Sequence, residues 1–523
     1  ARGREPALNI VKAALTVGSF TLVSRVLGFV RDLMIARVLG ASAMADSFFV
    51  SFKLANLFRR LFAEGAFNAA FVPLFARTLE GEGEDEAGRF AREALAIMTT
   101  VLLVVVLLAL LAMPYLVRVL APGFEPDGER YGLAVELSRI TFPYLMFISL
   151  AALFSGILNS VGQFAAAAFA PIILNLVLIS ALLLASLHPE TPAHALAWGV
   201  FVAGILQLLW VAVAAKRNGM ALRLQRPRVT PRIKRLFTLM LPGAIGSGVY
   251  QVNLVIDMWF ASLLPVGAVS YLFYADRLNQ LPLGIIGIAI GTALLPMLSR
   301  QFRAGQDQAA SQTQNRAIEM GLLLTLPAAA ALIVLATPII QVLFERDAFT
   351  AADTTATAAA LMAFSVGLPA YVLIKVLVPG FFAREDTVTP VKVAAVCLIA
   401  NVLLILALIG PLAHVGIALA TALSNAVNAT LLTVILLRRG HLRLDARLRR
   451  SVPRIALATL AMAVALLLAN RLLPIAHPAL ALAATILIGA AVYGVAAVGL
   501  GAADLADLRR QLSRRGQAVE PGA

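Results

Sequence analysis

Five arginines lie within long apolar segments of the sequence, where a charged side chain is normally excluded. They are Arg25, Arg31, Arg59, Arg60 and Arg277. An arginine at the centre of a bilayer costs about 2.5–3.5 kcal/mol on insertion scales, so such residues usually face a wet cavity or a partner. Several cations inside one protein therefore predict a polar chamber for an anion. Because a planar guanidinium can bond two oxygens at once, phosphate or pyrophosphate is the anion that fits best.

Acidic side chains accompany these arginines. In the first apolar segment Arg25 and Asp32 are seven residues apart, which predicts a shared helix face, and Arg31 lies beside Asp32. In the eighth segment Asp276 precedes Arg277. The second segment carries a polar stripe that is predicted to line the protein interior, with Asn56 and Arg59 on its flanks. The members of the stripe are Asp46, Lys53, Arg60 and Glu64.

An alternative is that these charges neutralise one another. Arg60 and Glu64 are four residues apart, and Arg31 could pair with Asp32 or Asp46. The cations nevertheless outnumber the acids, which predicts that some guanidinium groups stay available. The cations of these segments are Arg25, Arg31, Arg37, Lys53, Arg59, Arg60 and Arg277, against the acids Asp32, Asp46, Glu64 and Asp276.

A second kind of site is suggested by an isolated acid, Asp257, in the seventh apolar segment. A buried carboxylate of this kind can be protonated, paired or a ligand for a cation. Asn401 and Asn425 could add oxygen ligands. We predict no cofactor and no metal site. An alternative is that the protein couples its activity to a monovalent cation or to the membrane potential.

The composition identifies the class of protein that holds these residues. The chain has 523 residues, 60% of them hydrophobic and only 14% charged, and a mean hydropathy of +0.89. Soluble domains carry about 25% charged residues, so this is a polytopic membrane protein. The net charge of +15 comes mainly from basic loops at helix ends, which fits membrane orientation better than nucleic-acid binding. The single cysteine, Cys397, excludes an internal disulfide and a cysteine metal site.

The apolar segments predict an all-α fold with fourteen transmembrane helices. Many segments exceed the roughly 20 residues that a span requires, which predicts tilt or kinks. The predicted helices are 9–37, 43–78, 89–120, 131–160, 164–187, 192–217, 232–264, 268–301, 313–343, 353–382, 388–410, 413–438, 451–472 and 477–501.

The distribution of basic residues predicts the orientation. Lysine and arginine concentrate in alternate loops, which places those loops and both termini in the cytoplasm by the positive-inside rule. The acidic stretch from Glu80 to Glu86 falls on the same side and is the exception. No cleavable signal peptide is apparent, because the first apolar segment continues as a helix without a cleavage site.

An internal repeat predicts two lobes. Asn56, Pro73 and Arg77 match Asn279, Pro296 and Arg300 at an offset of 223 residues. A second match, at an offset of 226 residues, relates Pro143 and Asn175 to Pro369 and Asn401. Six helices per copy predict a parallel pseudo-twofold repeat with a site between the lobes. The predicted parts are an N-lobe at 1–220, a C-lobe at 221–440, two further helices at 441–503 and a basic tail at 504–523.

Several motifs resemble the MurJ (MviN) family of lipid II flippases, within the multidrug/oligosaccharidyl-lipid/polysaccharide exporter superfamily. The motifs are SRVLGFVRD, ADSFFVSFKLANLFRRLFAEGAFNAAFVPLF, APGF, ITFPYL, YADRLNQLPLGIIGIAIGTALLPMLSR and VKVLVPGFFAREDTVTPVK. The resemblance runs from about residue 10 to residue 440. It implies two six-helix lobes, two extra helices that offer a groove for a lipid tail, and transfer of the undecaprenyl-pyrophosphate-linked peptidoglycan precursor (lipid II) to the outer leaflet of the bacterial inner membrane.

The resemblance also assigns roles to residues. It implies that the arginines essential in the family correspond to Arg25, Arg31, Arg59 and Arg277, with Asp46 and Glu64 on acidic positions of the same motifs. Lipid II and membrane lipids are the implied partners, together with other cell-wall synthesis proteins.

Two other functions are alternatives. The first is a cation-coupled drug exporter or another polysaccharide-lipid exporter of the same superfamily. A drug/cation antiporter would need an acidic chamber, which the excess of arginine disfavours. A membrane-embedded cell-wall glycosyltransferase or scaffold would need a catalytic carboxylate in a recognisable motif. The sequence carries no Walker loop, no HExxH and no GxSxG motif, so it predicts a transporter and no enzyme.

Overall fold

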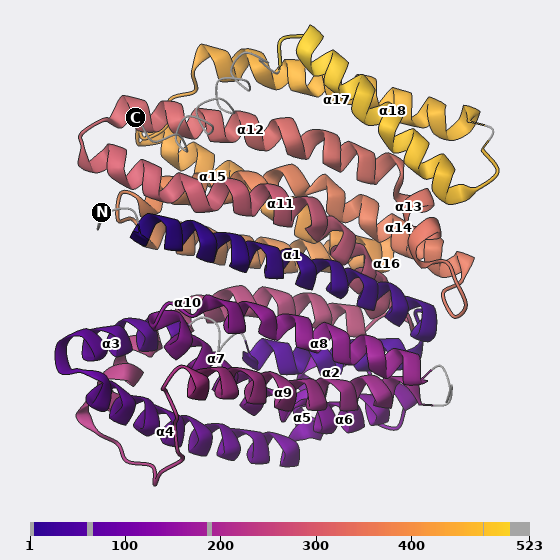
Figure 1. Ribbon diagram of the computed structural model, residues 1–523. Helices are drawn as coiled ribbons and strands as arrows, with labels where there is room; N and C mark the ends of the chain where they lie inside the picture. The colour runs from indigo at the N-terminus through magenta and orange to yellow at the C-terminus, as the bar shows by residue number, and fades with distance from the viewer. Residues whose placement is uncertain (1–4, 60–65, 186–190, 474, 503–523) are drawn as a thin grey trace. The chain divides into compact units, whose positions relative to one another are not determined.

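The computed structural model describes residues 5–59, 66–185, 191–473 and 475–502, and within these residues the chain is helical with no strand (Figure 1). Contacts group the chain into two compact units. The first comprises Ala1–Ser270 with Arg346–Thr350, and the second comprises Tyr271–Glu345 with Ala351–Ala523. The two lobes predicted from the internal repeat, with boundaries at residues 220 and 440, stay a prediction.

The first unit contains the helices from α1 to α10. They are α1 (Glu5–Leu39), α2 (Ala43–Arg59), α3 (Ala66–Glu82), α4 (Glu84–Leu111), α5 (Met113–Leu120), α6 (Glu129–Thr141), α7 (Tyr144–Ser160), α8 (Phe164–Ala185), α9 (Pro192–Arg217) and α10 (Pro231–Ser262). Two predicted helices, 89–120 and 131–160, are each interrupted. The interruptions fall at Ala112, two residues before Pro114, and at Phe142–Pro143, because proline lacks the N–H that the preceding turn needs.

The second unit contains most of α11 and the helices that follow it. They are α11 (Ala268–Arg303), α12 (Asp307–Val334), α13 (Ala336–Phe344), α14 (Ala351–Val366), α15 (Leu368–Phe382), α16 (Val388–Arg438), α17 (Ala446–Leu472) and α18 (Pro478–Gly499). The predicted helices 313–343 and 353–382 are interrupted at Leu335 and at Gly367. The predicted helices 388–410 and 413–438, by contrast, run together in α16. They meet at Ala413, whose φ of 48° and ψ of −128° turn the chain sharply back on itself.

Nine helical segments among the described residues are long and apolar enough to cross a membrane. They span 84–111, 129–160, 164–185, 192–217, 307–334, 351–382, 388–438, 446–472 and 478–499. The chain is therefore an all-helical, multi-pass membrane protein, as its composition predicts. The fourteen spans and the pseudo-twofold repeat stay predictions.

The acidic stretch that breaks the charge pattern has partners in the first unit. Arg232, in the first turn of α10, donates to Glu82 at 2.5 Å and to Glu86 at 2.9 Å. The neighbouring Thr230 hydroxyl donates to Glu93 Oε2 at 2.8 Å. Glu82, Glu86 and Glu93 therefore bind side chains at the start of α10, and the orientation of the chain in the membrane stays a prediction.

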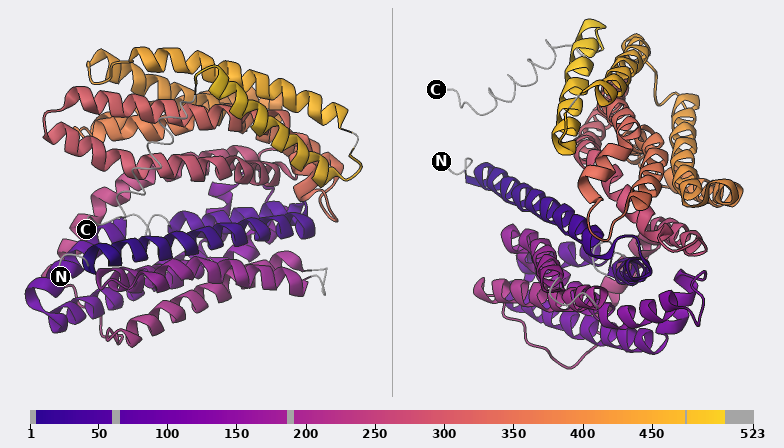
Figure 2. Two further views of the ribbon diagram at one scale, coloured as in Figure 1. Left: turned by 45° about the horizontal axis from the view of Figure 1, so that its top comes forward. Right: turned by 90° about the vertical axis from the view of Figure 1, so that its right-hand side faces the viewer.

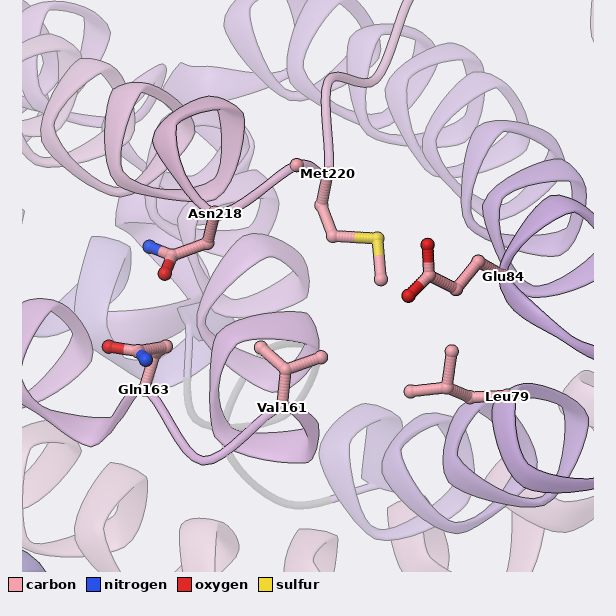
Figure 3. Close-up of a pocket in the computed structure, with 7 residues that line it drawn as sticks. Leu79, Glu84, Val161, Gln163, Asn218 and Met220 are labelled. Atoms are coloured by element: carbon pink, nitrogen blue, oxygen red, sulfur yellow. The ribbon is translucent and has the colours of Figure 1, made fainter.

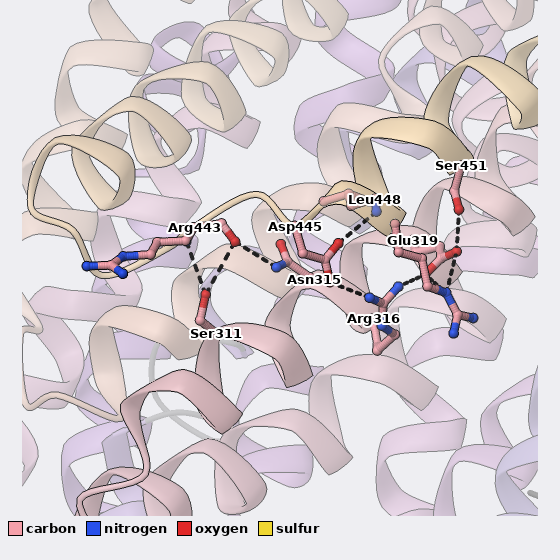
Figure 4. A network of polar contacts seen from close by, with 9 residues as sticks. Ser311, Asn315, Arg316, Glu319, Arg443, Asp445, Leu448 and Ser451 are labelled. Atoms are coloured by element: carbon pink, nitrogen blue, oxygen red, sulfur yellow. Dashed lines mark hydrogen bonds and ion pairs between the residues drawn. The ribbon is translucent and has the colours of Figure 1, made fainter.

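The start of α17 and the linker before it are attached to α12 through a polar network (Figure 4). Glu319 accepts a hydrogen bond from Ser451 Oγ at 2.6 Å and ion pairs with Arg447 at 3.3 Å and with Arg316. Asp445 caps α17 by accepting from Leu448 N at 2.7 Å. The linker before α17 is therefore fixed to the same helix that α17 packs against.

The α17–α18 hairpin itself is close-packed. The two helices run side by side in the views of Figures 1 and 2. A β-carbon at Gly489 would overlap the Leu466 side chain, so any other residue there would require that side chain to shift. Tyr493 Oη donates to Leu323 O at 2.6 Å and joins α18 to α12. Many leucines of the hairpin stay exposed on its other surfaces, as expected for a lipid-facing pair.

Candidate functional site

Arg31 is buried, and each of the three nitrogen atoms of its guanidinium donates a hydrogen bond. Its Nε and one terminal nitrogen donate to Asp32 Oδ1 at 3.0 and 2.6 Å. Its other terminal nitrogen donates to Asn175 Oδ1 at 2.9 Å, and the Asn175 amide donates to Ser24 O at 2.9 Å. The ring of Phe52 lies 5.9 Å from the guanidinium carbon. In this structure Arg31 is therefore part of an internal ion pair, one of the two interpretations that the sequence allowed.

The partner role of Asn175 was not predicted. The sequence marked Asn175 only as a repeat position, although an asparagine within an apolar helix must find a hydrogen-bond partner. The residue comes from α8, whereas Arg31 and Ser24 belong to α1. The amide thus joins these two helices through one arginine and one backbone carbonyl.

Arg25 has a different environment on the same helix. Its side chain is exposed, and no hydrogen bond or ion pair joins it to any other residue that the structure describes. Asp32, by contrast, is 3% exposed. The spacing of Arg25 and Asp32 places them on one face of the helix, as predicted, but their exposure differs. The reason is that α1 is largely exposed from residue 15 to residue 26 and largely buried from residue 31 onward.

Asp46 is fully buried and serves as a helix cap. Its carboxylate accepts from the backbone N–H groups of Gly267 and Ser270 at 2.8 and 3.0 Å and from Ser270 Oγ at 2.6 Å. These N–H groups open α11, where a carboxylate is favoured by the helix dipole. The cation near Asp46 is Arg130, at 3.7 Å, and not Arg31. Asp46 therefore has a structural role in the first unit.

Arg59 ends the described part of α2. Its Nε donates to Asn56 Oδ1 at 2.9 Å, and Asn56 Nδ2 donates to Phe52 O at 2.8 Å. Arg59 and Lys53 are both half-buried. Arg60 and Glu64 lie outside the described residues, so their predicted ion pair and their place in the polar stripe stay predictions.

In the second unit, Arg277 and Asp276 lie on α11 and are half-buried. The guanidinium carbon of Arg277 lies 4.7 Å from the centre of the Phe273 ring, which is a cation–π contact. Asp276 accepts a hydrogen bond from the Gln280 amide, one turn away. The Arg277 guanidinium is thus placed against an aromatic ring.

Comparison with known proteins decides the family. The family model described as lipid II flippase MurJ matches residues 35–485. A probable lipid II flippase MurJ from Rhizobium tropici is 47% identical over 520 residues, with 97% of each chain covered. The chain belongs to the MurJ family. The lipid II flippase MurJ of Burkholderia cenocepacia is 38% identical and covers 83% of this chain and 85% of its own.

Solved structures agree with this family assignment. A lipid II flippase MurJ in an inward closed conformation has a TM-score of 0.79 and 26% identity, and covers 92% of this chain and 98% of its own. An inward-facing multidrug resistance MATE transporter has a TM-score of 0.67 at 16% identity, with 82% of this chain and 98% of its own covered. The second likeness concerns the fold alone. The resemblance inferred from the motifs is confirmed.

The residues proposed for ion coupling lie on two different helices. Asp257 is half-buried on α10, in the first unit. Asn401 is fully buried and Asn425 half-buried, and both belong to α16 in the second unit. Among the described residues no group of three or more histidine, cysteine or carboxylate side chains could hold a metal ion. Coupling to a monovalent cation or to the membrane potential stays a prediction.

A pocket in the first unit lies apart from the cationic residues. It has a volume of about 240 Å³ and joins the turn after α7 to the turn after α9 and to the start of α4 (Figure 3). Its lining includes Glu84, Gln163, Asn218 and Met220. All of these residues come from loops and helix ends, and no arginine of α1 or α2 lines the pocket.

Proposed function

We propose that this protein moves lipid II, the undecaprenyl-pyrophosphate-linked peptidoglycan precursor, from the inner to the outer leaflet of the bacterial cytoplasmic membrane. The observation that carries the proposal is the family match along nearly the whole chain, with 97% of both this chain and a 47% identical relative covered. The relatives are named as flippases, so the proposed activity is transport by alternating access and no catalytic step is required.

Arginine supplies the chemistry that the pyrophosphate needs. Each guanidinium can donate two parallel hydrogen bonds to an anionic phosphate, in place of the water that the head group loses. Arg25 is exposed, Arg59 is half-buried at the end of α2, and Arg277 is half-buried beside Phe273. We assign Arg25, Arg59 and Arg277 to direct contact with the pyrophosphate. The polyprenyl tail stays in lipid, where the exposed leucines of α17 and α18 can pack against it.

Arg31 has a conditional role in this proposal. Its guanidinium is held by the Asp32 carboxylate at 2.6 Å, so an incoming anion must compete with that carboxylate. A pyrophosphate carries more than one negative charge and can displace a single carboxylate when it binds close by. Arg31 would then change partner during the transport cycle, while Asp32 neutralises it in the absence of substrate.

The antiporter alternative has a weaker basis. Its support is the MATE-like fold at 16% identity, which is shared by proteins with different substrates. A cationic substrate would meet Arg25, Arg59 and Arg277 with like charge. We therefore keep lipid II as the substrate.

Reconstitution tests the proposal. The purified chain is incorporated into vesicles with lipid II, and the outer-leaflet fraction is scored with and without a sodium, proton or electrical gradient. We expect lipid II to appear in the outer leaflet faster than in protein-free vesicles. Vesicles that contain Arg59→Ala serve as the matched control, because they hold a chain of the same size. Equal rates in all three preparations would contradict the proposed activity.

A further inference from the structure

One motif of the second unit is not explained by substrate binding. The sequence PGFFARED ends α15 and forms the short turn into α16. Arg384 lies in this turn and donates to two backbone carbonyls, Gly380 O at 2.8 Å and His441 O at 2.9 Å. Its guanidinium carbon lies 3.9 Å from the centre of the Phe302 ring, near the end of α11. One side chain therefore joins the ends of α11 and α15 to the chain that follows α16.

Asp386 makes a second set of bonds in the same turn. Its carboxylate accepts from Thr389 N at 2.9 Å and from Thr389 Oγ1 at 2.6 Å, which satisfies the first turn of α16. It also ion pairs with Arg439, just after the end of α16, at 2.7 Å. The hydrogen bonds from Thr389 lower the pKa of Asp386 to about 2, so the carboxylate is charged at neutral pH.

The geometry of α16 explains why these bonds matter. The helix turns back at Ala413, so its first residue, Val388, and its last, Arg438, lie at the same end of the hairpin. Asp386 and Arg439 close that end, and Arg384 ties it to α15. Helix ends are the places where local opening starts, because their carbonyl and N–H groups have no partner within the helix.

A hydrophobic cluster lies next to these bonds. It includes Phe381, Leu436 and Leu442, each 1% exposed or less, and Cys397, which is 6% exposed. Opening of the hairpin end would expose these side chains. Cys397 is the only cysteine of the chain, so its reactivity reports directly on that opening.

We propose that Arg384, Asp386 and Arg439 form a clasp that holds the ends of α11, α15 and α16 together as one body during transport. This role rests on the proposed flippase activity, because the clasp would let the joined ends of α11, α15 and α16 move together during transport without separating from one another. We call the three residues positioning residues because the contacts that they make are to helix ends and turns. The clasp keeps the hairpin end closed when the protein changes conformation.

The reaction rate of Cys397 with N-ethylmaleimide tests the clasp without any substrate. In the full-length purified chain we expect Arg384→Ala to raise that rate about tenfold, because two hydrogen bonds from a charged donor are lost. Arg439→Ala removes the ion pair to Asp386 and a hydrogen bond of 3.2 Å to Thr389 Oγ1, but it leaves the bonds of Arg384 and those between Asp386 and Thr389 in place, so it should raise the rate by a smaller factor. Asp386→Asn keeps an oxygen acceptor for Thr389 and should fall between wild type and Asp386→Ala. An unchanged rate in both Arg384→Ala and Arg439→Ala would overturn the clasp.

Arg438→Ala is the matched control. Arg438 is exposed, adjoins Arg439, and has no hydrogen bond or ion pair within the part of the chain that the structure covers. The Cys397 rate of this variant should equal that of wild type, and an increase equal to that of Arg439→Ala would show that net charge alone matters. Lipid II transfer is measured in parallel and should fall in the order in which the Cys397 rate rises. Unchanged transfer with a raised Cys397 rate would refute the positioning role, whereas failure of the wild-type chain to transfer lipid II would refute the proposed function and leave the Cys397 result valid.

Discussion

Arg25 and Arg31 lie on the same helix, yet only one of them is available to a ligand. Arg31 is 7% exposed and donates to Asp32 and Asn175, whereas Arg25 is exposed and has no partner among the described residues. The difference follows from packing, because the second half of α1 is buried and the first half is not. An arginine within an apolar segment is therefore not in itself a binding residue. The residues packed around it decide whether it stabilises the protein or binds a ligand.

The largest expected effect is on stability and concerns the buried arginine. Arg31→Ala leaves the Asp32 carboxylate buried without its cation, which should cost about 3–5 kcal/mol. The thermal unfolding midpoint in detergent should fall clearly. The double variant Arg31→Ala with Asp32→Ala removes both charges and should recover much of the loss. A midpoint for Arg31→Ala equal to that of wild type would show that the two arginines do not differ as described.

The second effect is on transport and concerns the exposed arginine. Arg25→Ala should leave the unfolding midpoint unchanged, because exposed substitutions usually stay within about 0.5 kcal/mol. Lipid II transfer should fall about tenfold or more through the loss of charge-assisted hydrogen bonds to the pyrophosphate. Growth of a flippase-depleted bacterium that carries the variant provides the same measurement in cells. Normal transfer would remove Arg25 from the binding site.

The third prediction tests geometry at Arg59. Arg59→Lys keeps the charge but loses the planar fork, so it should transfer lipid II several-fold more slowly than wild type if the contact to phosphate is bidentate. Protein level in the membrane, measured by immunoblot, is the control. Full activity of the lysine variant would assign a point-charge role to Arg59.

The smallest effect concerns the neutral partner of Arg31. Asn175→Ala removes one acceptor from the guanidinium while Asp32 stays in place, so a loss of about 1 kcal/mol is expected. The thermal midpoint should therefore fall much less than in Arg31→Ala. A loss as large as that of Arg31→Ala would mean that the asparagine, and not the ion pair, holds the arginine.

The sequence predicted the helical class, the family and most helix ranges, because hydropathy and local motifs are short-range signals. It did not predict the breaks at Ala112 and Pro143, since a proline within a long apolar run can either kink a helix or end it. The partners of the charged residues were also beyond reach. Asp46 caps a helix that begins at Ala268, and Arg31 donates to Asn175 on another helix. Such contacts depend on how distant helices pack, which spacing within one helix cannot reveal.

Equilibrium binding of lipid II to the purified chain tests whether Arg25 and Arg277 hold the pyrophosphate. We expect Arg25→Ala and Arg277→Ala each to weaken binding of lipid II, and neither to change binding of an undecaprenol lipid without pyrophosphate. Equal affinity of wild type and both variants for lipid II would contradict the claim that these guanidinium groups hold the pyrophosphate.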